Sequence, residues 1–146
     1  MTSIDVVSEV DTVRDQIKAF SDKDWDAWRR GMDAGVTYEE PATGRTITGI
    51  DQVLEGFKLW TTAFPDLKGT ITGIVSSGNQ VVAEIEWAGT LTGPLMAPTG
   101  KIEPTGKHGV IKAAQVFIFE EGRVKYMRHY FDMMDILRQA GALPSS

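Results

Sequence analysis

The sequence predicts an α+β fold in which helices pack on one face of a β-sheet. Apolar residues recur every three or four positions up to Phe64, a spacing typical of amphipathic helices. From Leu67 onward the period falls to two, as in strands, and the chain closes with a short helical segment. A chain of 146 residues with 42% hydrophobic content fits a single domain, residues 1–146, with a real core.

Two helices are expected in the N-terminal part. The first covers residues 3–21 and has an apolar stripe made by Ile4, Val7, Val10, Val13, Ile17 and Phe20. The second carries Trp25, Trp28 and Met32 on one side and ends near the glycines of residues 31–35. We interpret Trp28 as a core residue.

A short hairpin and a third helix follow. Residues 36–40 form a strand closed by Pro41, and residues 45–48 form the returning strand. Asp51 is a good N-cap for the third helix, which Pro65 ends. The apolar stripe of this helix consists of Val53, Leu54, Phe57, Trp60, Thr61 and Phe64.

Strands at residues 70–75, 80–91 and 110–119 then build a sheet. Glu84 and Glu86 lie on the outer, wet face of the second of these strands. The connecting loop, residues 93–106, is either the mouth of a pocket or an oligomer contact. A strongly curved sheet wrapped by helices makes a cone, and its open end is the expected ligand pocket.

The stretch from residue 124 to residue 141 begins as a strand and ends as a short helix, with Asp132 at the changeover. Strict alternation places Val124, Tyr126, Arg128, Tyr130 and Asp132 on one face, which we interpret as a pocket wall. His129 then lies on the opposite face. A bulge near Asp132 would exchange His129 and Tyr130.

Composition excludes several classes of protein. A net charge of −5 with interspersed signs argues against nucleic-acid binding. Without cysteine there are no disulfides and no thiolate chemistry, and two histidines do not provide the ligands of a zinc site. The acidic N-terminal stretch lacks a signal layout and no apolar run reaches membrane-spanning length, so a cytoplasmic protein is expected.

Five motifs occur in order at consistent separations. They are Phe64-Pro65-Asp66-Leu67, the Gly89–Gly93 segment after Trp87, Pro104-Thr105-Gly106-Lys107, Glu121-Gly122-Arg123-Val124, and Asp132 followed by Leu137-Arg138-Gln139-Ala140-Gly141. Together they resemble the SnoaL-like polyketide cyclase (ester cyclase) family over about residues 13–141. This resemblance implies an NTF2-like cone: a curved antiparallel or mixed sheet wrapped by N-terminal helices, with a short C-terminal helix.

The resemblance also implies a reaction, the intramolecular aldol ring closure of a polyketide-derived methyl ester, with no metal and no organic cofactor. The acid/base aspartate of the family falls on Asp132, and a polar position of the preceding strand falls near Gln115. The family often has histidine where this chain has Leu91, and can have it where this chain has Phe117. Family members usually pair through the exposed sheet, so a homodimer or homotetramer is expected.

One carboxyl group can deprotonate a carbon acid and then protonate a carbonyl oxygen if it sits between the two atoms. Burial of Asp132 among Tyr130, Phe131, Phe117 and Trp87 would raise its pKa toward that of a useful base. The structural alternative is that Asp132 caps the helix that follows.

Gln115 either holds a substrate oxygen, or positions Asp132 or a water, or is a polar residue on a solvent-facing strand. Tyr38 and Glu40 share a strand face; Glu40 is either a pocket carboxylate or a solvated residue at a strand end. His129 is either a second acid/base group or a surface or dimer contact. The remaining candidate substrate-binding residues are Trp60, Phe64, Trp87, Phe117 and Tyr130, of which Trp60 and Trp87 either stack on a flat ligand or belong to the core.

Three functions are compatible with these features. The first is the aldol cyclase on a small hydrophobic or aromatic substrate. The second is another enzyme on the same cone, such as an epoxide hydrolase, a hydratase or an isomerase, in which a carboxylate and Gln115 would hold a water. The third is a non-catalytic protein that binds a small molecule or dimerises.

Overall fold

The computed structural model describes residues 8–142 and contains four helices within that range. They are α1 (Glu9–Asp22), α2 (Trp25–Arg30), α3 (Ile50–Ala63) and α4 (Met133–Gln139). Ser8 caps α1 by accepting a hydrogen bond from the Val10 amide at 3.1 Å. The predicted helix positions Ile4 and Val7 lie outside the described residues.

Six strands form one mixed sheet in the order β2-β1-β8-β7-β4-β3. All neighbouring pairs are antiparallel except β1 and β8, which run parallel. The predicted α+β class, with a mixed sheet, N-terminal helices and a short C-terminal helix, is confirmed. The strands are β1 (Met32–Glu40), β2 (Arg45–Thr48), β3 (Lys68–Ser77), β4 (Gln80–Thr90), β7 (His108–Glu120) and β8 (Arg123–Tyr130).

The structure differs from the expectation in several details. Met32 begins β1 instead of ending a helix, because α2 stops at Arg30. The N-cap of α3 is Gly49, and Asp51 in its first turn forms an ion pair with Arg29 at 2.7 Å. The loop of residues 93–106 contains a small hairpin, β5 (Leu95–Ala97) and β6 (Gly100–Ile102).

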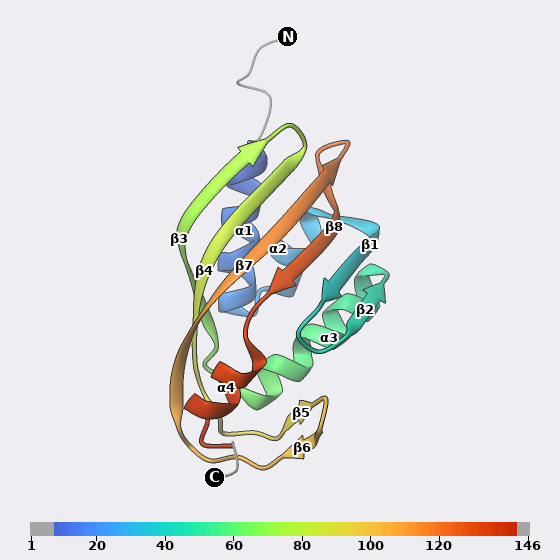
Figure 1. Cartoon of the computed structure of the whole chain (residues 1–146). Helices are drawn as coiled ribbons and strands as arrows, with labels where there is room; N and C mark the ends of the chain where they lie inside the picture. Colours follow the sequence, from blue (N-terminus) through green and yellow to red (C-terminus); the bar gives the residue numbers. More distant parts are fainter. Residues whose placement is uncertain (1–7, 143–146) are drawn as a thin grey trace.

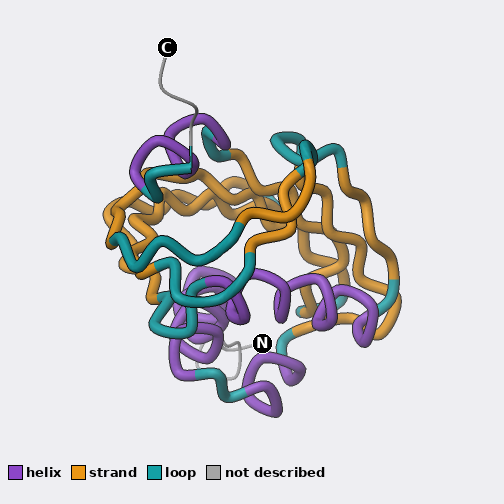
Figure 2. Tube along the Cα trace, turned by 90° about the horizontal axis from the view of Figure 1, so that it is seen from below, coloured by secondary structure: helices purple, strands orange, loops and turns teal. Residues whose placement is uncertain are grey.

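The helices cover the concave side of the curved sheet. Figure 1 shows α1 and α2 behind the long strands, α3 beside the β1–β2 hairpin, and α4 at the opposite end from the β3–β4 turn. Seen from below, the strands and the helices surround the interior from opposite sides (Figure 2). The main core lies between these layers and includes Val13, Trp28, Val36, Ile85, Phe117 and Met127.

An irregularity in β8 decides which of its side chains face inward. Phe119 on β7 pairs with Val124, whereas Ile118 pairs with Tyr126, so Lys125 is an extra residue in β8. Because a bulge shifts the alternation by one residue, Val124 and Met127 are both fully buried. His129 therefore follows Met127 to the concave side.

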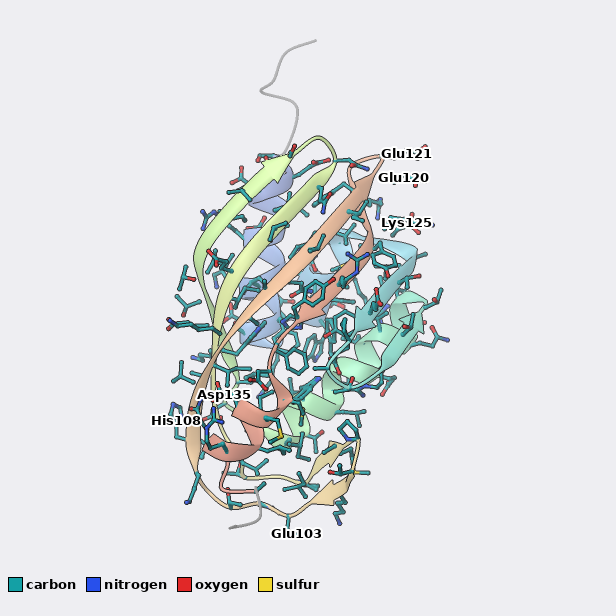
Figure 3. The ribbon with its side chains drawn as sticks, in the orientation of Figure 1. Glu103, His108, Glu120, Glu121, Lys125 and Asp135 are labelled. Carbon is teal, nitrogen blue, oxygen red and sulfur yellow. The ribbon has the colours of Figure 1, made fainter. Side chains whose placement is uncertain are left out.

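Several charged residues lie at the two ends of the cone. Figure 3 shows Glu120, Glu121 and Lys125 at one end of the molecule and Glu103 at the other. His108 is exposed at the start of β7, near α4. Within residues 8–142, none of the helices combines the length and the apolar character needed to cross a membrane.

Candidate active site

A cavity opens inside the cone between the sheet and helices α1 to α3. The space inside it, together with the solvent space at its open mouth, measures about 900 Å³. Seven of the ten predicted site residues line it: Tyr38, Trp60, Phe64, Trp87, Gln115, Phe117 and His129. Most of the predicted site residues therefore lie in the wall of this cavity, which further residues of the core complete.

The wall is largely aromatic. Trp60, in the last turn of α3, and Phe64, just after that helix, stack with ring centroids 6.4 Å apart. Phe131 meets Trp60 edge to face at 5.6 Å and His129 at 5.2 Å. Rings held in these relative orientations offer flat apolar surfaces to a flat ligand.

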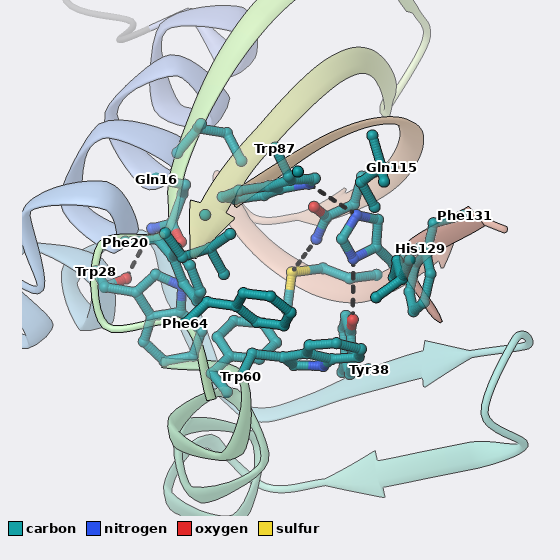
Figure 4. Close-up of a pocket in the computed structure, with 18 of the residues that line it drawn as sticks. Gln16, Phe20, Trp28, Tyr38, Trp60, Phe64, Trp87, Gln115, His129 and Phe131 are labelled. Carbon is teal, nitrogen blue, oxygen red and sulfur yellow. Dashed lines mark hydrogen bonds between the residues drawn. The ribbon is translucent and has the colours of Figure 1, made fainter. Parts of the chain in front are cut away.

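His129 is the titratable group that faces this aromatic space. Its Nε2 accepts a hydrogen bond from the indole Nε1–H of Trp87 at 3.2 Å. Its Nδ1 lies 3.0 Å from the hydroxyl of Tyr38 (Figure 4). Because an indole can only donate, Nε2 carries no proton, and Nδ1–H donates to the Tyr38 oxygen.

Tyr38 connects His129 to a buried carboxylate. The Tyr38 hydroxyl donates to Oε2 of Glu40 at 2.7 Å, and the Trp60 indole donates to the same oxygen at 3.0 Å. The other oxygen, Oε1, accepts from Thr43 at 2.5 Å and from Arg45 Nη2 at 2.8 Å. Glu40 is fully buried, so the alternative of a solvated residue at a strand end is wrong. It does not line the cavity itself but contacts the lining residues Tyr38 and Trp60.

Burial and these partners set the charge states. Burial lowers the pKa of His129 to about 4, and the nearby Glu40 carboxylate opposes this shift. Burial alone would raise the pKa of Glu40, but hydrogen bonds from Thr43, Tyr38 and Arg45 outweigh it and lower that pKa. Burial, reinforced by Glu40, raises the pKa of Tyr38. At neutral pH the group is thus a neutral imidazole, a neutral phenol and a carboxylate.

Gln115 and Phe117 occupy adjacent inward positions of β7. Gln115 pairs with His129 across the sheet, and its amide donates to Sδ of Met127 at 3.4 Å. It is buried, so the alternative of a solvent-facing glutamine is wrong. Phe117 is 1% exposed and also lines the cavity.

Asp132 does not lie in this cavity. Its carboxylate is exposed and caps α4, accepting from the amides of Met134 at 2.9 Å and Asp135 at 3.3 Å. The expected burial of Asp132 among aromatic rings is therefore wrong. The chain turns from β8 into α4 at this residue, and the unpaired amides of the first helical turn hold the side chain.

Tyr130 also lies outside the cavity. It is 46% exposed on the convex face of the sheet. The bulge at Lys125 reverses the strict alternation that placed Tyr126 and Tyr130 on the pocket wall. His129 and Phe131 take the inward positions instead.

Gln16 on α1 was not predicted to contribute to the site. It is 3% exposed, and its Nε2 donates to the main-chain oxygen of Trp28 at 2.7 Å. Its Oε1 is buried at the cavity wall and has no hydrogen-bond partner among the described residues. The signal in the sequence was a glutamine within the apolar stripe of Val13, Ile17 and Phe20.

The mouth of the cavity is bordered by Lys107 and Gln139. The amide of Gln139 both accepts from Val110 N and donates to Val110 O, each at 2.7 Å, which ties α4 to β7.

Among residues 8–142 no three His, Cys, Asp or Glu side chains gather as a metal-binding group. His108 contacts Thr90 on the surface and is separate from His129.

The sequence model of the family described as SnoaL-like polyketide cyclase matches residues 11–140. The chain belongs to the SnoaL-like polyketide cyclase family. This family binds small hydrophobic substrates, in keeping with the aromatic cavity. None of the curated proteins matches the sequence.

Several solved structures share the fold of this SnoaL-like protein. A protein assigned as a SnoaL-like polyketide cyclase from Jannaschia sp. CCS1 is 23% identical, with a TM-score of 0.81 and 93% of each chain covered. IdmH from Streptomyces antibioticus, assigned as a polyketide cyclase, is 21% identical, with a TM-score of 0.80 and coverage of 92% of this chain and 99% of that chain.

A third similar structure is a hypothetical protein from Catenulispora acidiphila DSM 44928 with a ketosteroid isomerase-like fold, in complex with trimethylamine. It is 22% identical, has a TM-score of 0.76 and covers 91% of this chain and 93% of that chain. At these identities the likeness establishes the NTF2-like fold and leaves the reaction to the site.

Proposed function

We propose that this protein is a cyclase that closes a ring in a flat, hydrophobic, polyketide-derived ester by an intramolecular aldol reaction, and that His129 moves the proton. The family membership supports the reaction class. The observation that carries the assignment of His129 is its place among the rings of the cavity, with the basic Nε2 held by nothing stronger than the 3.2 Å contact from Trp87.

The proposed reaction begins at a carbon between two carbonyl groups. Nε2 of His129 takes a proton from this carbon, and the resulting enolate attacks a second carbonyl carbon of the same molecule. The new carbon–carbon bond leaves an alkoxide, to which the imidazolium returns the proton. No atom is gained or lost, and the chemistry uses no cofactor and no metal.

The partners of His129 suit both halves of this cycle. When Nε2 is engaged with the substrate, the indole N–H of Trp87 is free to donate to the enolate oxygen. The Glu40 carboxylate, acting through the Tyr38 hydroxyl, stabilises the imidazolium and fixes the ring tautomer. A pKa of about 4 makes His129 a weak base. A weak base is sufficient for an acidic β-dicarbonyl carbon, as in ketosteroid isomerase, where the general base is an aspartate whose pKa is only modestly raised.

Asp132 is the competing acid/base candidate, and the two assignments predict opposite results. The test is turnover of a synthetic polycyclic aromatic methyl ester carrying a β-dicarbonyl side chain. We expect His129→Gln to slow ring closure by about 100- to 10,000-fold, the usual contribution of a general acid/base group. Asp132→Asn, which retains the helix cap, should stay within about threefold of wild type.

Ligand binding, followed by tryptophan fluorescence, separates a chemical defect from a binding defect. His129→Gln should still bind the ester, whereas loss of turnover in Asp132→Asn alone would reverse the assignment. Incorporation of oxygen-18 from solvent into the product would show that the enzyme adds water to its substrate and does not close a ring. Binding of the ester without any turnover would indicate a non-catalytic binding protein.

A cytoplasmic location also stays a prediction, which cell fractionation would test.

A further inference from the structure

The apolar cavity contains one polar atom without a partner. Gln16 Oε1 is buried at the wall formed by α1 and α2 and accepts no hydrogen bond from any residue in the range 8–142. Leaving a buried acceptor unsatisfied is unfavourable, and most such atoms in folded proteins have a partner. On the same wall, Ile17 and Phe20 carry no side-chain donor, and the Trp28 indole N–H makes no hydrogen bond to this oxygen.

The orientation of the Gln16 amide is fixed by its surroundings. Its Nε2 donates at 2.7 Å to the Trp28 carbonyl, in the last turn of α2, where carbonyls lack helical partners. A flipped amide would place two oxygens against each other. Gly31 packs so closely that a Cβ there would lie 2.7 Å from Nε2. The oxygen therefore faces the cavity, as Figure 4 shows.

The donors on the opposite wall are already engaged. The Tyr38 hydroxyl donates to Glu40, and the Trp87 indole donates to His129. The Gln115 amide contacts Met127. These groups belong to the sheet side of the cavity, whereas Gln16 belongs to the helix side.

We infer that Gln16 is a specificity-determining residue that accepts a hydrogen bond from a hydroxyl or N–H group of the bound molecule. The ligand is thus a flat apolar molecule with one donor at the end that reaches the α1–α2 wall. A phenolic hydroxyl fits this description, and its methyl ether does not, because the ether offers no donor and adds bulk against apolar side chains. This inference rests on the proposed binding of a flat hydrophobic substrate, and not on the ring-closing step.

The test compares three probes by direct binding: an anthraquinone with one hydroxyl at the outer edge of a terminal ring, its methyl ether, and the unsubstituted anthraquinone. Wild-type protein should bind the hydroxylated probe about 10- to 100-fold more tightly than the ether. Gln16→Met keeps the side-chain length but removes the acceptor, so it should abolish this preference and leave the affinity for unsubstituted anthraquinone within about threefold.

Gln115→Met is the matched control, since it removes the other buried amide of the same cavity. It should retain the preference for hydroxyl over ether. Equal binding of hydroxylated probe and ether by wild type, a comparison that needs no variant, would overturn the inference while leaving the proposed function standing. An unchanged preference in Gln16→Met would also overturn it. If none of the probes binds, both the proposed function and this inference fall.

Discussion

At the scale of single residues, His129 links the charge state of the cavity to the stability of the fold. Burial lowers its pKa from 6.5 to about 4. Below pH 6.5 the unfolded chain binds a proton that the folded protein does not, so folding becomes less favourable as the pH falls toward 4. Below pH 4 both states are protonated and the penalty levels off, at roughly 3 kcal/mol for a shift of this size.

The free energy of unfolding, measured by urea denaturation from pH 7.5 to pH 4, tests this linkage. Carboxylates titrate in the same range, so the informative quantity is the difference between wild type and His129→Gln. This difference should grow in favour of the variant as the pH falls. His108→Gln, on the surface, should keep the wild-type slope. Parallel curves for wild type and His129→Gln would show that folding does not change the pKa of His129.

Asp132 provides a second prediction at this scale, because its carboxylate caps α4. Asp132→Ala should lower the free energy of unfolding by about 1 kcal/mol, the usual value of an N-cap, while Asp132→Asn should cost little. Thermal or urea denaturation of the two variants checks this. Equal losses in both would mean that the charge, and not the cap, is what the fold uses.

Most of the residues predicted for the site line the cavity, but Asp132, Tyr130 and Glu40 do not. Trp60 was identified from the regular apolar spacing of its helix, whereas Phe117 was identified from the family resemblance, as a position that can carry histidine. His129 and Tyr130 were exchanged because the bulge at Lys125 comes from pairing with β7, which strand alternation alone does not reveal. Asp132 had two compatible roles, and the geometry of the β8–α4 junction decides for the cap in this structure.

At the scale of elements, Glu40 joins β1, β2 and α3. It accepts hydrogen bonds from Tyr38 on β1, Arg45 at the start of β2 and Trp60 on α3, all from a fully buried position. Removing one partner of a buried ion pair leaves the other charge poorly compensated. The hairpin and the helix should therefore lose their mutual orientation together.

Glu40→Ala should lower the free energy of unfolding by about 3–5 kcal/mol. Glu39→Ala is the matched control, since the adjacent glutamate pairs with Arg128 at 3.0 Å on the outer face, where ion pairs add little. Amide hydrogen exchange should accelerate in β2 and in the last turns of α3 in the first variant and not in the second. Similar denaturation midpoints for the two variants would contradict the role of Glu40 as a junction.

Element types were predictable, whereas the links between elements were not. The change of period at Leu67 precedes the long strands that begin with β3 at Lys68, and α3 ends just before Pro65, as expected. The Glu40 network depends on Arg45 and Trp60, which approach it only after the hairpin and α3 have packed. A strand-end glutamate followed by proline is usually solvated, so its burial could not be inferred from local sequence.

At the scale of the whole molecule, the convex face of the sheet is the surface where two copies are expected to pair. Across this face Val82 lies opposite Val116, Ile118 opposite Tyr126, and Ala114 opposite Tyr130. Helices cover the concave side, and no element within residues 8–142 forms a second layer on the convex side. The same face also carries the charged residues Glu84, Glu86 and Arg128. Exposed apolar residues surrounded by polar ones are typical of a surface that binds another protein.

We expect a homodimer, or a homotetramer built from it, that buries this face. Size-exclusion chromatography with light scattering should give at least twice the monomer mass of 16.0 kDa. Ala114→Arg places a charge at the centre of the face opposite Tyr130 and should produce monomers. Leu59→Arg, at an exposed position of α3 on the helix side, is the control and should leave the mass unchanged. A monomeric wild type at working concentration would contradict pairing, whereas dimers that persist in Ala114→Arg would place the interface elsewhere.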